Sequence, residues 1–165
     1  MKNFMLDSAY LKTASTPMNA RKPNRKLKRP SISKEVEKAA VLLQKLVRMK
    51  AANSKGFSRC TTCSKWVHYK NCDAGHYFSR RHLRLKLLEE NIHVQCKSCN
   101  MRMGCPTVHD EYRTYMVDMY GAKRVEAMKR LTKWSKPKFK MSEVKEFQKY
   151  LREQIKIQQK RLGEI

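Results

Sequence analysis

The sequence predicts an α+β protein in which a small core of short strands is flanked by α-helices and preceded by a disordered basic arm. Three observations support this fold class. Two Cys-x-x-Cys pairs enclose a segment that contains β-branched and aromatic residues. Apolar residues recur at helical spacing on both sides of that segment, whereas the first thirty residues show no hydrophobic period. We therefore divide the chain into an arm (1–30), an amphipathic helix (31–55), a cysteine-rich core (56–106) and a helical C-terminal region (107–165).

The charge of the chain indicates a polyanionic partner. Its 165 residues include 38 Lys and Arg against 14 Asp and Glu, which gives a formal net charge of +24. This excess is far larger than solubility requires, so nucleic acid is the natural candidate. The basic residues recur along the whole chain and are interleaved with aromatic ones, as on many nucleic-acid surfaces. Composition alone leaves a ribosomal-type or scaffolding protein with basic faces open.

The sequence also predicts a cytoplasmic protein without a membrane partner. No segment approaches the roughly 18 consecutive apolar residues of a membrane helix. Asp7 interrupts the region in which a signal peptide would be apolar. In such a compartment, the six cysteines are more often metal ligands or free thiols than disulfides.

The arm, residues 1–30, contains eight Lys or Arg, three prolines and a single acidic residue. This composition predicts disorder, with phosphate contacts that are independent of DNA sequence or, more simply, a contribution to solubility. Beyond it, four segments combine helical spacing of apolar residues with a cap or a charged first turn. They are residues 33–52 with a cap at Ser33, 107–121 with a cap at Thr107 and a stop at Gly121, 123–134, and 142–162 with a cap at Ser142. The last helix either packs on the domain or forms a dimer interface.

The two cysteine pairs are the strongest local signal in the chain. Cys60 and Cys63 form the first pair, and Cys96 and Cys99 form the second. Two such pairs can place four thiolates tetrahedrally around one Zn²⁺. A redox role is disfavoured, because no βαβ pattern surrounds either pair. The β-branched and aromatic residues from Trp66 to Tyr69 predict a short strand hairpin. We therefore expect a structural zinc that links this hairpin to the following segment and supplies about 10 kcal/mol of folding free energy.

Between and beside these pairs the chain reads DAGHY at 73–77 and NIHVQCKSCN at 91–100. The order Cys-x-x-Cys, His, Asn, Cys-x-x-Cys, Asn resembles the HNH endonucleases in their HNN variant, which have a ββα-metal fold framed by such a zinc. More closely, the two motifs resemble the NinG or Rap recombination proteins of lambdoid phages. The resemblance covers residues 60–121 well and the last helices loosely, and it leaves the arm outside. It implies that residues 56–106 form an HNH-like, zinc-stapled nuclease core.

The resemblance also implies roles for individual residues. His76 matches the general base, Asn91 the residue that holds the loop carrying this base, and Asn100 a ligand of the catalytic cation, Mg²⁺ or Mn²⁺. In the usual HNH pattern an acid or histidine precedes the base and binds the metal, but Gly75 occupies that place here. Asp73 can reach the same ion only if the two residues that follow it form a bulge; otherwise it caps a turn.

Phosphodiester hydrolysis requires such a set of residues. A base with a pKa near neutrality generates the nucleophile, and a hard cation stabilises the charge that develops on the phosphate. The basic residues near the motifs are then expected to contact the DNA backbone. They are Arg80, Arg81, Arg84, Lys97 and Arg102.

Four further residues have less context. His82 could bind the metal or line a polar surface, and His93 is expected to pack inside the structure. Cys72 and Cys105 lie outside the spacing of the two pairs and are expected to be free thiols or small apolar residues.

These observations together predict a metal-dependent endonuclease that cuts branched DNA of the Holliday-junction or D-loop type during phage recombination in a bacterial cytoplasm. Because two strands must be cut, a homodimer is a further expectation. One alternative is a catalytically silent zinc-ribbon DNA-binding protein, which would need the zinc cysteines but not His76. A less favoured one is an RNA-binding protein of ribosomal type.

Overall fold

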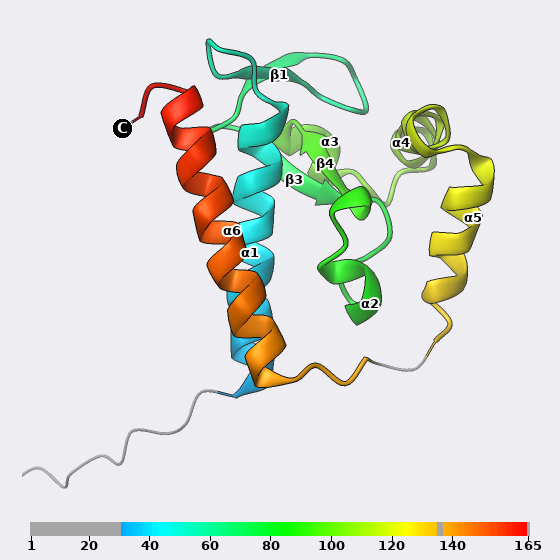
Figure 1. Ribbon diagram of the computed structural model, residues 1–165. Coiled ribbons are helices and arrows are strands. Elements are labelled where there is room, and N and C mark those ends of the chain that lie inside the picture. The colour runs from blue at the N-terminus through cyan, green and yellow to red at the C-terminus, as the bar shows by residue number, and fades with distance from the viewer. Residues whose placement is uncertain (1–30, 135–136, 165) are drawn as a thin grey trace, which may run out of the picture.

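The computed structural model describes residues 31–134 and 137–164, so the predicted disordered arm lies outside the described residues. The described chain combines helices with two small antiparallel sheets (Figure 1), as the α+β prediction requires. Its elements are α1 (Ile32–Ala51), β1 (Phe57–Arg59), β2 (Trp66–His68), β3 (Asp73–His76), α2 (Leu83–Lys86), the 3₁₀ turn η1 (Glu89–Asn91), β4 (Ile92–Gln95), α3 (Lys97–Met101), α4 (Pro106–Tyr120), α5 (Ala122–Leu131) and α6 (Met141–Arg161).

Helix α1 forms because apolar residues from Val36 to Val47 recur on one face, and this face is buried. The backbone N–H of Lys34 donates to the side chain of Ser31 over 3.4 Å. The cap is therefore Ser31, and the prediction of Ser33 was wrong by two residues. Both serines precede an acidic first turn, so the local sequence could not separate them.

Helix α6 lies beside α1 and runs in the same direction, as Figure 1 shows. Near its start the side chain of Gln148 donates to the backbone oxygen and to the carboxylate of Glu35, both over 2.9 Å. At its end Arg161 donates to the backbone oxygen of Ala52 over 2.8 Å. Helix α6 begins after Lys140, so the predicted cap at Ser142 was wrong.

The apolar face of α6 is covered by α1. Its residues Val144, Leu151 and Ile155 are buried. Leu151 and Ile155 belong to the apolar cluster that contains Leu43 of α1. Of the two alternatives for this helix, packing on the domain is the one that the structure shows.

The second sheet and the helix after it form the centre of the molecule. Strands β3 and β4 are antiparallel, with Asp73 opposite Gln95 and His76 opposite Ile92, and α3 follows β4 directly. Every residue of β3 is paired in turn, so the bulge that was stated as the condition for metal binding by Asp73 is not formed. Continuous pairing places the side chains of Asp73 and Gln95 on the same face of the hairpin.

Apolar clusters lie on both sides of the β3–β4 hairpin. One joins the hairpin to α1 and α6, and the other joins α2 to α4 and α5, on the opposite side in Figure 1. Helix α4 begins at Pro106, one residue before the predicted cap at Thr107, because proline suits the first helical position. It ends at Gly121, whose φ of 79° favours glycine, as the sequence predicted. None of the described helices has the length and apolar character needed to cross a bilayer.

Candidate active site and metal centre

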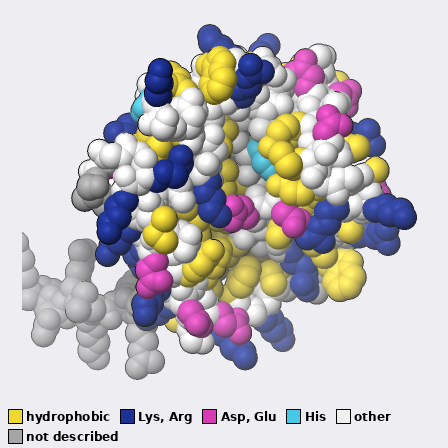
Figure 2. All heavy atoms as spheres, turned by 45° about the horizontal axis from the view of Figure 1, so that its top comes forward, with side chains coloured by type: hydrophobic (Ala, Val, Ile, Leu, Met, Phe, Trp, Pro, Cys, Tyr) yellow, Lys and Arg dark blue, Asp and Glu magenta, His cyan; other side chains and the backbone are white. Residues whose placement is uncertain are grey.

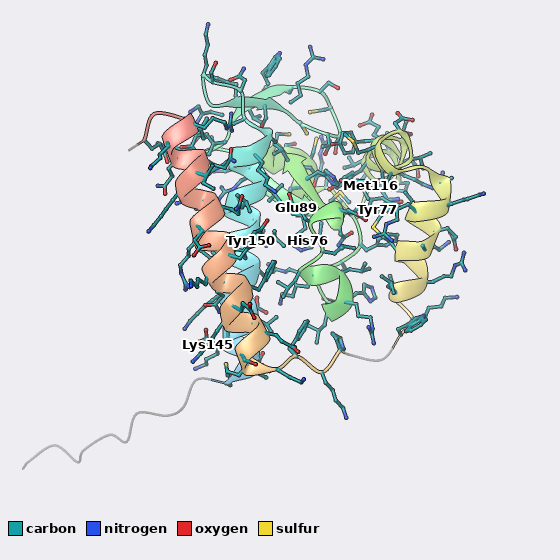
Figure 3. The ribbon with its side chains drawn as sticks, viewed as in Figure 1. His76, Tyr77, Glu89, Met116, Lys145 and Tyr150 are labelled. Carbon is teal, nitrogen blue, oxygen red and sulfur yellow. The ribbon has the colours of Figure 1, made fainter. Side chains whose placement is uncertain are left out.

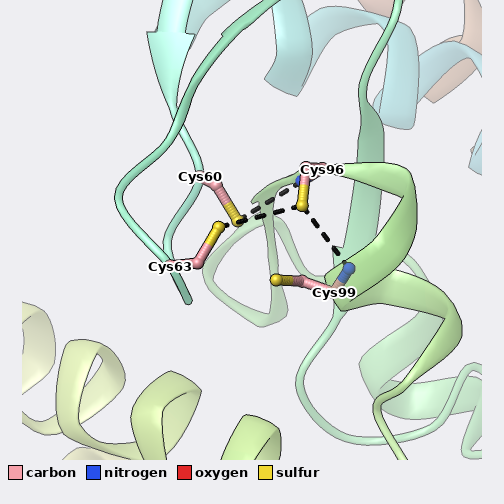
Figure 4. Close-up of side chains that lie close together, drawn as sticks. All are labelled: Cys60, Cys63, Cys96 and Cys99. Atoms are coloured by element: carbon pink, nitrogen blue, oxygen red, sulfur yellow. Dashed lines mark hydrogen bonds between the residues drawn. The ribbon is translucent and has the colours of Figure 1, made fainter.

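The four paired cysteines come together in space. Cys60 and Cys63 lie in the turn between β1 and β2, and Cys96 and Cys99 lie where β4 passes into α3 (Figure 4). Their four sulfur atoms are all within 4.8 Å of one another. The Sγ atoms of Cys63 and Cys96 are 3.8 Å apart, about the separation that a tetrahedral site with Zn–S bonds of roughly 2.3 Å requires. The cluster could therefore hold a zinc ion.

Backbone N–H groups surround the sulfur atoms of this cluster. Cys96 N–H donates to the sulfur of Cys60 over 3.3 Å, and Cys99 N–H donates to the sulfur of Cys96 over 3.5 Å. Burial raises the pKa of the Cys60 thiol, but such backbone donors outweigh it and bring the pKa to about 7. Burial also raises the pKa of Cys99. Four thiolates side by side thus require a cation among them.

A cavity of about 610 Å³ is lined by Asn100, the residue that follows Cys99, and by none of the four clustered cysteines. It lies between α1, β3, the loop that follows β3, and the segment from α3 to the start of α4. Its polar lining includes Gln44, Arg48, Asp73, His76, Arg80, Asn100 and His109. Figure 2 shows Lys and Arg side chains distributed over the visible face of the molecule, with fewer acidic ones. Within the cavity itself, the two guanidinium groups of Arg48 and Arg80 outnumber the single carboxylate of Asp73.

His76 ends β3 and lies between α1 and α2 in the view of Figure 3. Its Nε2 is 3.2 Å from the backbone oxygen of Lys86. A carbonyl oxygen can only accept, so Nε2 donates and Nδ1 keeps its lone pair. Burial, and then the charge of Arg80, lower the pKa of His76. The ring is therefore neutral at pH 7 and able to take up a proton.

Asn91 is fully buried and holds the loop that follows His76. Its Nδ2 donates to the backbone oxygens of Phe78 (2.9 Å) and Leu85 (3.1 Å), and its Oδ1 accepts from the N–H of Phe78 (2.8 Å). Three bonds from one side chain define the path of this loop. Asn91 thus fixes the segment from Phe78 to Leu85, which follows His76.

Asp73 and Asn100 are in direct contact at the edge of the cavity. The Nδ2 of Asn100 donates to Oδ2 of Asp73 over 2.9 Å, although no bulge is present. Asp73 reaches this place because it shares a face of β3 with Gly75, the position that precedes the base. A carboxylate and an amide oxygen are ligands that Mg²⁺ and Mn²⁺ prefer. The donor set therefore fits a hard divalent ion.

A family model described as "Bacteriophage Lambda NinG protein" matches residues 7–161. The chain belongs to the NinG family. Membership implies a function related to phage recombination. The match also includes most of the arm and α1, beyond the segment that the motifs covered. Comparison with curated proteins and with solved structures gave no match.

In this NinG family protein, the predicted DNA-contacting residues are spread over several surfaces. Arg80 lines the cavity. Arg81 and Arg84 instead line a second hollow beside Trp134, together with His82. The structure therefore does not bring His82 to the Asp73–Asn100 pair. The remaining two predicted residues, Lys97 and Arg102, are exposed on α3 and at its end.

Three polar residues of the cavity in this NinG family protein, Gln44, Arg48 and His109, were not among the predicted site residues. Arg48 comes from α1, and its Nη1 donates to the backbone oxygen of Cys72 over 3.1 Å. His109 comes from α4 and stacks on Tyr77, with ring centroids 5.0 Å apart. All three lie outside the two motifs at 73–77 and 91–100. The only sequence signal is the pair Gln44 and Arg48, polar residues four apart beside the apolar face of α1.

His93 is buried, as predicted, and belongs to a hydrogen-bonded chain. Tyr112 donates its hydroxyl proton to the backbone oxygen of Gly75 over 2.9 Å, and it lies 3.1 Å from Nδ1 of His93. Nδ1 therefore donates to Tyr112, and Nε2 accepts from the hydroxyl of Tyr120 over 2.9 Å. These hydrogen bonds attach α4 to the backbone of Gly75, the residue just before His76.

The pKa of His93 makes the stability of the protein depend on pH. Burial lowers it from 6.5 to about 4. Between pH 6.5 and 4 the unfolded chain binds a proton at this histidine that the folded protein does not. The contribution of His93 to the free energy of unfolding is therefore fully present above pH 6.5 and falls as the pH decreases. We expect a loss of about 1 kcal/mol between pH 7.5 and 5.5 from this residue.

The measurement is urea unfolding at several pH values with zinc in excess, for the natural protein and for His93→Gln. The variant has a lower free energy of unfolding throughout but lacks this part of the pH dependence. Parallel curves for the two proteins would contradict the assignment.

Proposed function

We propose that this NinG family protein is an HNH-type, metal-dependent endonuclease that hydrolyses phosphodiesters in branched DNA during phage recombination. The main support is the position of His76. Its unprotonated Nδ1 belongs to a ring that lines the same cavity as the Asp73–Asn100 pair, and two arginines, Arg48 and Arg80, line this cavity as well. A base, oxygen ligands and phosphate-binding cations are what hydrolysis of a phosphodiester requires.

In the proposed reaction, Nδ1 of His76 takes a proton from a water molecule. The water oxygen forms a bond to phosphorus, and the bond between phosphorus and the leaving oxygen breaks. Arg48 and Arg80 face the negative charge of the phosphate and orient it. A divalent ion held by Asp73 and Asn100 would stabilise charge on the phosphate and on the leaving oxygen.

The local topology is in agreement with an HNH-like core. Strands β3 and β4 pair with each other and are joined by a segment that contains α2 and η1, helix α3 follows β4, and the second cysteine pair lies at the junction of β4 and α3. The base ends the first strand, and Asn100 lies on the helix. Asn91 fixes the segment that leads from one strand to the other.

Two exposed tryptophans favour a nucleic acid with unstacked bases. Trp66 is 54% exposed with the guanidinium of Arg59 5.1 Å from its ring, and Trp134 is 63% exposed with that of Arg84 5.5 Å from its ring. Exposed aromatic rings beside cations are platforms on which bases stack. Unpaired or unstacked bases occur at branch points, which supports a branched substrate over a continuous duplex.

A homodimer would allow two strands of a junction to be cut symmetrically. The apolar face of α6 is covered by α1, so we propose that a dimer uses another surface.

The function is tested by incubating the zinc-loaded protein with a labelled four-way junction, a matched linear duplex and a matched single strand. Each DNA is incubated with the protein either in Mg²⁺ or in EDTA, and the EDTA incubation is short enough to leave the zinc in place. We expect Mg²⁺-dependent cleavage that is fastest on the junction. Tight binding without cleavage would instead support the alternative, a catalytically silent zinc-ribbon DNA-binding protein.

A further inference from the structure

We infer that Gln95 is a third oxygen ligand of the divalent cation at the Asp73–Asn100 pair. This inference rests on the proposed function, because that cation is part of it. The residue was not among those expected from the sequence motifs, where it is simply the position before Cys96.

The side chain of Gln95 is fully buried, and its amide nitrogen is well satisfied. Nε2 donates to Oγ1 of Thr62 over 2.8 Å and to the sulfur of Met103 over 3.2 Å. A thioether can only accept, so the amide must present its nitrogen on that side. The oxygen Oε1 therefore points away from Thr62 and Met103.

That oxygen has no hydrogen-bond partner among the described residues. Leaving a buried carbonyl oxygen unpaired is unfavourable, and such atoms are rare in folded proteins. The oxygen of Gln95 therefore indicates a ligand that the chain itself does not supply.

The position of Gly75 shows where this oxygen points. A Cβ atom on Gly75 would stand 1.9 Å from Oε1 of Gln95 and 3.0 Å from Oδ1 of Asn100. Two amide oxygens thus face the space that the missing side chain leaves open. Oxygen atoms that only accept repel each other unless a donor or a cation lies between them. A cation satisfies both.

The third oxygen of the site comes from the same face. Asp73 lies opposite Gln95 in the hairpin and accepts from Asn100. One carboxylate and two amide oxygens form a ligand set for a hard ion such as Mg²⁺ or Mn²⁺, with water and a phosphate oxygen in the remaining positions. Gly75 has no side chain and so leaves room for these three oxygen atoms. In the inferred site, Gln95 on the facing strand replaces the acid or histidine that usually precedes the base in the HNH pattern.

The test measures Mn²⁺ binding directly, by calorimetry and by electron paramagnetic resonance on the zinc-loaded protein. Gln95→Met has a similar volume but lacks the oxygen, and we expect it to weaken Mn²⁺ binding by roughly 10- to 100-fold. Gln95→Glu adds a charge to the same position and is expected to tighten binding. The matched control is Thr62→Val, which removes a partner of Nε2 but keeps the Gln95 oxygen, and which should bind Mn²⁺ as the natural protein does.

Two results would overturn the inference: unchanged Mn²⁺ binding by Gln95→Met, or equal weakening by Thr62→Val, which would indicate a structural role alone. Zinc content and circular dichroism verify that each variant is folded. If Gln95→Met does not fold, Gly75→Ala tests the same space, because its Cβ would displace the Gln95 oxygen. Retention of full Mn²⁺ affinity in this variant would also overturn the inference.

The outcome also separates this inference from the proposed function. If the natural protein cuts DNA and Gln95→Met binds Mn²⁺ normally, the ligand assignment fails and the nuclease stands. If Mn²⁺ binds through Gln95 but no DNA is cut, the site stands and the nuclease fails. A natural protein that binds no Mn²⁺ overturns both.

Discussion

The variant His76→Ala is expected to lower the rate of junction cleavage by roughly 10²- to 10⁴-fold, the usual contribution of a general base. Its dissociation constant for the junction should stay within a few fold. The reason is that the ring of His76 supplies a lone pair at Nδ1 but no charge for phosphate, since burial keeps it neutral. Single-turnover cleavage gives the rate, and fluorescence anisotropy gives the affinity.

A matched control is His68→Ala, which removes a histidine of β2 that does not line the cavity. It should cleave at a rate near that of the natural protein. Added imidazole should restore part of the activity of His76→Ala, because the ring that it replaces lines an open cavity. Equal losses of cleavage and affinity, without rescue, would show that His76 has a binding or structural role instead.

The pH dependence of cleavage gives an independent measure of the same base. Below the pKa of His76 the ring is protonated and cannot accept a proton, so the rate should rise with pH and then level off. Burial lowers this pKa from its ordinary value of 6.5, so the midpoint of the rise should lie below pH 6.5. A midpoint clearly above pH 6.5 would contradict the assignment of His76 as the base.

Replacing Cys96 by serine is expected to remove the zinc and most of the folded structure together. Cys96 lies between β4 and α3, its N–H donates to Cys60, and its sulfur caps the helix by accepting from Cys99. Zinc binding contributes on the order of 10 kcal/mol, which is comparable to the total stability of a small protein. Metal analysis and far-ultraviolet circular dichroism, with thermal unfolding, measure both effects.

Cys105→Ser is the control for this experiment. Cys105 is exposed, lies outside the four-cysteine cluster and makes no side-chain cap for α4. This variant should keep one zinc ion per chain and an unchanged melting temperature. A Cys96→Ser protein that is folded and binds a full equivalent of zinc would contradict the four-cysteine site.

The helices and the cysteine cluster were predictable because their determinants are local. Apolar spacing from Val36 to Val47 indicates the buried face of α1, and Gly121 ends α4 with a positive φ. The caps were less predictable. Ser31 and Ser33 are chemically equivalent, and the difference between them depends on where the backbone turns, which is decided by the packing of the whole helix.

The cavity was predictable only in part. Asp73 and His76 lie between the two cysteine pairs and Asn100 directly follows the second pair, and the motifs pointed to all three. Arg48 could not be inferred, because it enters the cavity only when α1 packs against the hairpin. The condition that Asp73 needs a bulge to reach Asn100 was wrong, because regular alternation already places Asp73 on the face of Gly75.

The sequence by itself determined the family, the positions of the four longest helices, the cysteine pairs and the candidate base, because each depends on residue type and spacing over a short range. Only the tertiary structure decided that α6 packs beside α1, that Arg48 lines the cavity and that the oxygen of Gln95 is left unpaired beside Gly75. These features depend on which segments meet across the hairpin. Such contacts between distant residues are set by the packing of the whole chain rather than by its local pattern.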